Sequence, residues 1–190
     1  MPAHRVVLTL ITLLVLIAPS ALARAPMPIP DAASVKAFEE QILAIHNKLR
    51  AKHGVPPMKW DGAIANYAKS RANLVSQRDG LSHGHAGLEG YGENLYWGAT
   101  SEALPSGEKA AAAAIESWYN EIKDYNFANP GFSGTTGHFT QVVWKDSTRL
   151  GCAIVQGKGA RWLETYVVCN YLVPGNMMGQ FPANVLPPKR

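Results

Sequence analysis

The chain has 190 residues, of which 17% are charged, and its formal net charge is +4 at pH 7. This length suits one domain with a sizeable core. The basic residues are scattered and form no Lys/Arg run, so nucleic acid is not expected as a partner.

Residues 1–23 have the features of a secretory signal peptide. Arg5 precedes an apolar stretch, residues 6–18, and Ala21-Leu22-Ala23 provides a small-residue cleavage site. The apolar stretch is shorter than the roughly 20 residues that a membrane-spanning helix needs. We therefore expect cleavage after residue 23 and a secreted, extracellular product without a membrane span (periplasmic if a Gram-negative bacterium retains it).

Residues 24–37 form a leader that is rich in proline up to Pro30, and three helices are expected after it. Each helix has apolar residues at helical spacing, whereas residues 80–96, rich in Gly, His and Ser, are expected to form a loop. The expected helices run from about Ser34 to His53, from about Asp61 to Arg78, and from about Glu108 to Tyr125. Asp61 is expected to be the N-cap of the second.

Two histidines of the first helix are expected to have structural roles. His46 lies within the helix, where a hydrogen-bonded histidine is more plausible than a metal ligand. His53 precedes Gly54 at the expected helix end, where a cation is favourable.

An aromatic loop follows the third helix. Tyr125, Phe127 and Phe132 surround an Asn-Pro-Gly turn, residues 129–131. Three large rings in such a turn either form a compact plug or an exposed apolar patch. The plug, with at least one ring buried, is the favoured interpretation.

His138 follows a Gly-rich turn, residues 133–137, and precedes the run Phe-Thr-Gln-Val-Val-Trp, residues 139–144. Aromatic and β-branched residues dominate this run, which predicts a strand. His138 would then lie at a loop-to-strand edge, where functional side chains concentrate.

The chain has two cysteines, Cys152 and Cys169, and both are predicted to lie in a β-hairpin. If residues 150–156 pair with residues 163–170 so that paired residue numbers sum to 321, the cysteines lie opposite each other. An even cysteine count in an exported protein then favours a disulfide. The alternative is a pair of buried free thiols.

Two segments carry a family resemblance. Residues 137–147, Gly-His-Phe-Thr-Gln-Val-Val-Trp-Lys-Asp-Ser, followed by Gly151-Cys152, resemble the first signature of the CAP superfamily (cysteine-rich secretory proteins, antigen 5 and pathogenesis-related proteins). Residues 166–171, Tyr-Val-Val-Cys-Asn-Tyr, resemble the second. The resemblance implies an α+β fold of the α-β-α sandwich type over residues 38–186, with a short tail at 187–190.

The resemblance also implies a metal site. His83, Glu93, Glu121 and His138 occupy positions at which family members gather two histidines and two carboxylates in one cleft. Two imidazoles suit Zn²⁺ or another divalent ion, and carboxylates can orient the ligands. His85 is the alternative to His83. Glu121 as a solvated carboxylate and Glu93 as a cap are the alternative roles of the two acids.

Three functions remain open at this point. The aromatic loop is similar to the motif through which some family members bind sterols, so a non-enzymatic secreted module for an apolar lipid, with an accessory metal site, is the preferred hypothesis. A metal-dependent hydrolase or protease using the same cleft is the second. However, the chain has neither an HExxH helix nor a G-x-S-x-G elbow. An extracellular protein-interaction module is the third.

Overall fold

The structure, a computed structural model, describes residues 24–77 and 90–189, so the expected signal peptide, His83 and His85 lie outside the described residues. The helices are α1 (Ala32–Lys52), α2 (Gly62–Ser76), α3 (Gly107–Asn120), the 3-10 turn η1 (Glu121–Asp124), α4 (Gly137–Val143) and α5 (Phe181–Asn184). The strands are β1 (Lys59–Trp60), β2 (Gly92–Thr100), β3 (Arg149–Lys158) and β4 (Leu163–Leu172).

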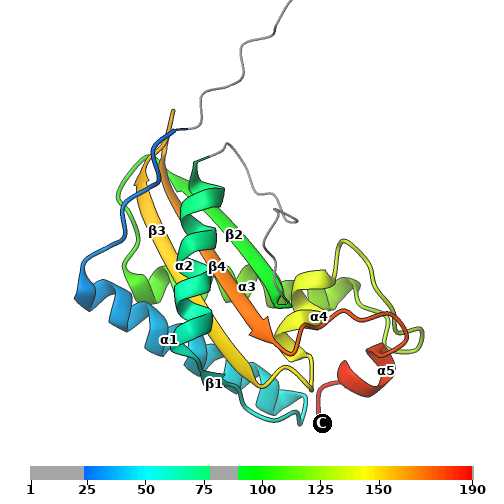
Figure 1. The fold of residues 1–190 in the computed structure, drawn as a ribbon. Helices are drawn as coiled ribbons and strands as arrows, with labels where there is room; N and C mark the ends of the chain where they lie inside the picture. Colours follow the sequence, from blue (N-terminus) through cyan, green and yellow to red (C-terminus); the bar gives the residue numbers. More distant parts are fainter. Residues whose placement is uncertain (1–23, 78–89, 190) are drawn as a thin grey trace, which may run out of the picture.

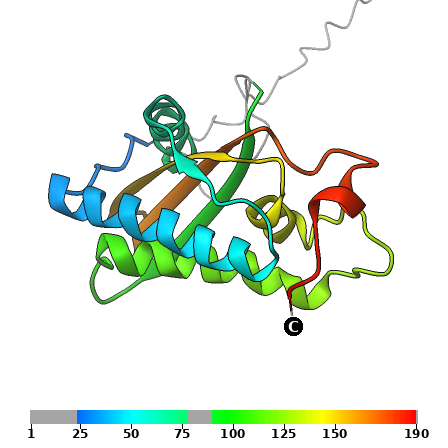
Figure 2. The ribbon, with the colours of Figure 1, turned by 90° about the horizontal axis from the view of Figure 1, so that it is seen from below.

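The elements form three layers (Figures 1 and 2). The central sheet has the strand order β1-β3-β4-β2, with β4 antiparallel to both of its neighbours and β1 parallel to β3. Helix α2 covers one face, and α1 and α3 lie side by side on the other (Figure 2). The expected α+β class and α-β-α sandwich are confirmed. No helix among the described residues is long and apolar enough to cross a membrane.

The sheet separates two cores because alternate residues of a strand face opposite sides. On the α2 side, Val155, Tyr166 and Val168 pack with Ala68 and Ala72. On the other side lies the larger core, to which α1, α3, α4 and alternate residues of β3 and β4 contribute. The apolar positions expected in the three helices lie in or against these cores.

The predicted hairpin has the predicted register. Cys152 pairs with Cys169, and Ala153 pairs with Val168. The two cysteines form a disulfide, as expected. In the chain-entropy account, closing a loop of this length stabilises the fold by about 3 kcal/mol.

Two expectations about local structure are wrong. The run after His138 is the helix α4 and not a strand, and part of the expected loop at 80–96 is strand β2. The intrinsic preference of β-branched residues against helix is small, so tertiary contacts can override it. Val142 and Val143 are fully buried in the larger core. The third helix also ends earlier than expected, at Asn120, and continues as η1.

Helix α4 is held at both ends by residues distant in sequence. At its start, Glu121 Oε2 accepts hydrogen bonds from the backbone N–H groups of His138 (2.9 Å) and Phe139 (3.0 Å). At its end, the buried Arg50 guanidinium donates to the carbonyl oxygens of Val142 (3.0 Å) and Trp144 (2.8 Å). These contacts satisfy groups that a seven-residue helix leaves unpaired at its termini.

Candidate functional site

His138 and Glu121 form the centre of the candidate site. The His138 Nδ1 lies 2.7 Å from Glu121 Oε1, while the other oxygen of the same carboxylate caps α4. The imidazole stacks on Trp118, with ring centroids 6.3 Å apart. In a neutral imidazole, donation from Nδ1–H to the carboxylate leaves the lone pair on Nε2, which is the tautomer that a metal ligand requires.

Glu93 lies in a different environment from this pair. Both of its oxygens accept hydrogen bonds from the Arg71 guanidinium, each at 2.7 Å, and Asn170 Nδ2 donates to Oε2 at 3.3 Å. The next residue, Asn94, faces the opposite side of the strand and donates to the carbonyl of His138 at 3.1 Å. Strand alternation therefore directs Glu93 towards α2 and Asn94 towards α4.

The described residues contain no group of three or more His, Cys, Asp or Glu side chains that could hold a metal ion. Of the four expected site residues, the structure brings together His138 and Glu121, and it pairs Glu93 with Arg71. His83 lies outside the described residues.

A buried polar chain connects this site to α1. His46 Nδ1 lies 2.8 Å from the Ile42 carbonyl, and His46 Nε2 lies 3.0 Å from the Tyr171 hydroxyl. Asn94 Nδ2 donates to the same hydroxyl at 3.2 Å. Burial lowers the pKa of His46 to about 4, so it is neutral and structural, as expected.

His53 differs from its expected role as a cation at the end of the first helix. Its ring lies between the Leu186 carbonyl (2.6 Å) and the Tyr119 hydroxyl (2.9 Å). Burial lowers its pKa, which favours the neutral form.

The aromatic loop contains one buried, one half-buried and one exposed ring. Tyr125 is buried and packs against Phe139 and Phe127, with centroid distances of 5.5 and 4.9 Å. Phe127 is half-buried against the larger core, whereas 56% of Phe132 is exposed. The favoured plug interpretation therefore holds for the first two rings, and Phe132 contributes to an apolar surface.

A pocket of about 240 Å³ opens beside this loop and is lined by Asp124–Asn126, Asn129–Ser133 and Thr136. Tyr125 is one of the residues that line the pocket, and its hydroxyl is buried and has no hydrogen-bond partner among the described residues. Burial raises the pKa of Tyr125; the Gly131 backbone amide opposes this shift but does not reach hydrogen-bond geometry. A buried polar group without a partner points to a ligand or to bound water.

Sequence reasoning missed Arg50, Arg71, Asn94 and Tyr171. A signal existed for the two arginines. Arg71 follows Ile64 by seven residues and Ala68 by three, and Arg50 follows His46 by four, so both lie on buried helix faces. A charge at such a position indicates a buried partner. Asn94 and Tyr171 carried no comparable signal.

Comparison with known proteins agrees with this fold. The sequence profile of the cysteine-rich secretory protein family (CAP) matches residues 43–171. The "Probable pathogenesis-related protein CaO19.6200" of Candida albicans is 40% identical over 157 residues, which cover 83% of this chain and 44% of that protein. "Secreted protein RBT4" of the same species is 42% identical over 146 residues, or 76% and 37% of the two chains. The chain thus spans less than half the length of these two relatives.

A human relative is similar over nearly its full length. The "Golgi-associated plant pathogenesis-related protein 1" is 36% identical over 158 residues, which cover 82% of this chain and 96% of that protein. Among solved structures, that of NaASP2 with Zn²⁺ has a TM-score of 0.64 at 24% identity and covers 86% of this chain and 92% of its own. That structure supports the fold. On the extent of the profile match and of the human alignment, the chain belongs to the cysteine-rich secretory protein (CAP) family.

Proposed function

We propose that the chain is a secreted, non-enzymatic module that binds a hydroxylated apolar lipid such as a sterol at the aromatic loop. The observation that carries this proposal is the Tyr125 hydroxyl, which is buried beside a pocket without a hydrogen-bond partner among the described residues. Leaving such a group unpaired costs about 1–3 kcal/mol. A ligand that brings one hydroxyl into the pocket recovers this energy.

The loop also provides an apolar surface for such a ligand. Phe132 is exposed and lines the pocket, and Phe127 and Tyr125 contact each other and Phe139 of the larger core through their rings. Burying about 200 Å² of ring and ligand surface would contribute about 5 kcal/mol before the loss of motion. Micromolar affinity is therefore expected.

Binding is preferred to hydrolysis because both carboxylates of the expected cleft are engaged. Glu121 caps α4 and holds His138, and Glu93 binds Arg71 through both oxygens. A carboxylate that acts as a general base needs an oxygen available for a water molecule.

The test of the lipid site is the substitution Tyr125→Phe, which removes one oxygen and keeps the ring. Native protein is expected to bind cholesterol about fivefold to tenfold more tightly than the analogue without the 3-hydroxyl, and Tyr125→Phe should bind both equally. Tyr96→Phe, at a half-buried tyrosine that lines a different pocket of about 330 Å³, is the matched control. Equal binding of both ligands by the native protein would contradict the role of the hydroxyl.

We also propose an accessory divalent-metal site in which His138 supplies one imidazole nitrogen, His83 supplies the second, and Glu121 orients His138. His138 and Glu121 fit a Zn²⁺ site. The contact of His138 Nδ1 with Glu121 favours the tautomer in which Nε2 can coordinate the metal. At Glu93, a metal would have to compete with the Arg71 guanidinium, so we assign it no ligand role.

Zinc titration calorimetry tests the metal site. His138→Ala and His83→Ala should each abolish most of the zinc affinity, and acidification should weaken binding because the ligand nitrogen must be unprotonated. A loss of zinc affinity in His85→Ala, with no loss in His83→Ala, would show that His85 is the second ligand. Unchanged affinity in His138→Ala would refute the site.

A further inference from the structure

Two neighbouring surface segments form a lobe without charged side chains. Residues 125–136 and 173–180, here called the charge-free lobe, contain no Asp, Glu, Lys, Arg or His. In a chain with 17% charged residues, about three would be expected in 20 positions. Charge is thus missing from one particular part of the surface.

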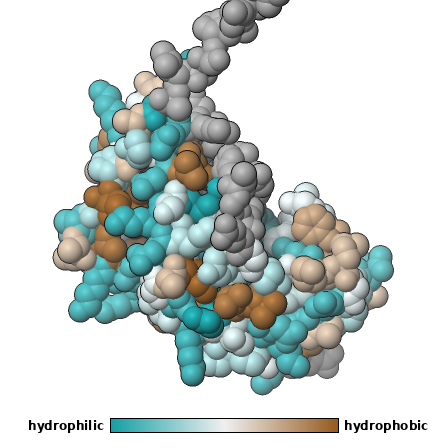
Figure 3. Space-filling model, viewed as in Figure 1, coloured by the Kyte–Doolittle hydropathy of each residue, from teal (hydrophilic) through white to brown (hydrophobic). Residues whose placement is uncertain are grey.

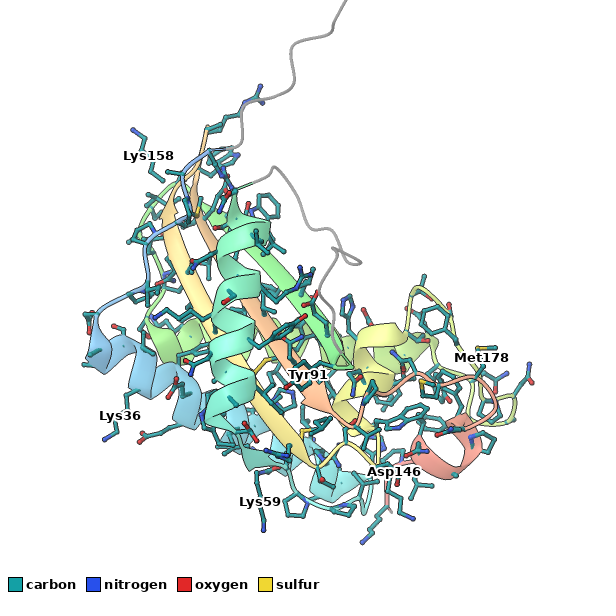
Figure 4. The ribbon with its side chains drawn as sticks, in the orientation of Figure 1. Lys36, Lys59, Tyr91, Asp146, Lys158 and Met178 are labelled. Atoms are coloured by element: carbon teal, nitrogen blue, oxygen red, sulfur yellow. A yellow bond between two sulfur atoms is a disulfide. The ribbon has the colours of Figure 1, made fainter. Side chains whose placement is uncertain are left out.

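The charge-free lobe instead exposes large apolar side chains. The exposed fractions are 78% for Met178, 56% for Phe132, 51% for Val173 and 47% for Met177. Figure 3 shows moderately apolar (tan) residues among hydrophilic ones on the end of the molecule that carries α4 and α5, and Figure 4 labels Met178 on this side. Met177, Met178 and Val173 belong to the segment that follows β4, and Phe132 belongs to the aromatic loop.

Hydrogen bonds hold the 173–180 segment of the lobe against α4. Asn176 Nδ2 donates to the Gly137 carbonyl (2.9 Å), and the amide of Gly175 donates to Gln141 Oε1 (2.8 Å). A Cβ on Gly137 would lie 3.3 Å from the Phe132 ring and 3.8 Å from Asn176 Nδ2, so Phe132 lies next to the 173–180 segment. These contacts therefore fix the backbone that carries the exposed apolar side chains.

Residues 177–180, which include both methionines of the lobe, form a tight turn. The amide of Gln180 donates to the carbonyl of Met177 (3.0 Å), and Gly179 has φ +80°, which favours glycine. Met178 lies at the corner of this turn, where its side chain points away from the protein. This hydrogen bond and those of Gly175 and Asn176 reduce the number of unpaired backbone groups that would enter an apolar phase.

We propose that the charge-free lobe inserts its apolar tips into the surface of a phospholipid bilayer. The inference rests on the proposed lipid-binding function in one respect: Phe132 belongs both to the lobe and to the pocket at Tyr125, so a docked lobe would let a lipid enter the pocket without crossing water. No charge needs to be desolvated within the lobe, and unbranched methionine side chains adapt to a fluid surface.

The charges that border the lobe identify the kind of bilayer. Lys123 is adjacent to Asp124, and Lys145 is adjacent to Asp146; all four are exposed. Opposite charges therefore balance at both borders, and these described residues form no cationic rim that would select anionic lipids. The expected partner is a neutral, phosphatidylcholine-type surface bound through apolar contact.

Flotation with phosphatidylcholine vesicles tests the proposal. The double substitution Met177→Ser/Met178→Ser should weaken partitioning about tenfold or more, since two exposed apolar side chains lose their buried environment. Leu74→Ser/Leu104→Ser is the matched control, because these leucines are 47% and 37% exposed and lie outside the lobe, on α2 and before α3. It should partition like the native protein. A tryptophan introduced by Met178→Trp should be quenched by brominated phosphatidylcholine, and one introduced by Leu74→Trp should not.

Further outcomes separate this proposal from the lipid site. The methionine variant should still bind cholesterol solubilised in detergent, whereas Tyr125→Phe should still float with vesicles. If the native protein floats but binds no sterol, the membrane proposal stands and the proposed ligand is wrong. Binding only to vesicles with phosphatidylserine, unchanged in the methionine variant, would overturn the membrane proposal. So would a native dimer in sedimentation velocity that the methionine variant dissociates, because a second copy would then cover the lobe.

Discussion

The β3–β4 hairpin and the charge-free lobe use their apolar residues in opposite ways. In β4 every residue except the two at its ends is buried, and Cys169 is crosslinked to β3. In the lobe, Phe132, Val173 and both methionines are about half exposed or more, and the hydroxyl of Tyr125 is buried without a partner among the described residues. The hairpin stabilises the fold, whereas we propose that the lobe contacts another molecule. Helix α4 lies between them and connects the two.

The largest expected loss of stability comes from removing the contacts of Arg50 with the end of α4, the helix that connects the two regions. Arg50→Met removes hydrogen bonds to the carbonyls of Val142, Trp144, Ser147, Lys145 and Pro56. Leaving several buried carbonyls unpaired should lower the free energy of unfolding by about 4 kcal/mol or more, measured by urea denaturation. Arg149→Met, at a guanidinium that is 53% exposed and paired with Asp61, should cost less than about 1 kcal/mol. Similar losses in both variants would contradict the role given to Arg50.

The second effect belongs to the hairpin alone. Cys152→Ser should lower the free energy of unfolding by about 3 kcal/mol through loss of the crosslink. Zinc and sterol binding by the folded fraction should be unchanged, because the disulfide lies in the larger core and not at the pocket. A selective loss of sterol binding would show that hairpin and lobe are not independent.

Acid should weaken the body of the molecule before it affects the uncharged lobe. The pKa of His46 is about 4 in the folded state and near 6.5 when unfolded, so the unfolded chain binds more protons between these pH values. Stability should fall by up to about 3 kcal/mol as the pH drops from 6.5 to 4. His53, with its lowered pKa, acts in the same direction.

The matched variant for the acid effect is His46→Gln, which cannot take up a proton. Its free energy of unfolding should depend less on pH over the range from 6.5 to 4, measured by denaturation at a series of pH values. An unchanged slope would assign the acid sensitivity to other groups.

A substitution in the lobe should have the smallest effect on stability, and it distinguishes the lobe from the core most clearly. Phe132→Ala should change the free energy of unfolding by less than about 0.5 kcal/mol, because its ring is 56% exposed, yet it should weaken sterol binding. Phe139→Ala, at a fully buried ring of the larger core, should cost about 3–5 kcal/mol. A large stability loss in Phe132→Ala would make the loop purely structural.

Much of the body could be predicted from local patterns. The inward stripes of the three long helices, the Asp61 cap and the register that pairs Cys152 with Cys169 all follow from spacing within short segments. Such spacing is specific because a shift by one residue turns apolar side chains towards solvent. The family resemblance predicted the residues of the candidate site, including His138 and Glu121, but not their contacts.

The sequence by itself determined the α+β class, the hairpin with its disulfide, and the residue types of the candidate site. Only the tertiary structure decided that residues 137–143 are helical, because Glu121 and Arg50 reach the ends of α4 from distant segments. It also decided that Glu93 pairs with Arg71, since strand alternation and the position of α2 act together there. The same holds for the unpaired hydroxyl of Tyr125 and for the methionines at the lobe tip. Burial and hydrogen-bond satisfaction depend on which segments meet in space, and no local pattern encodes that meeting.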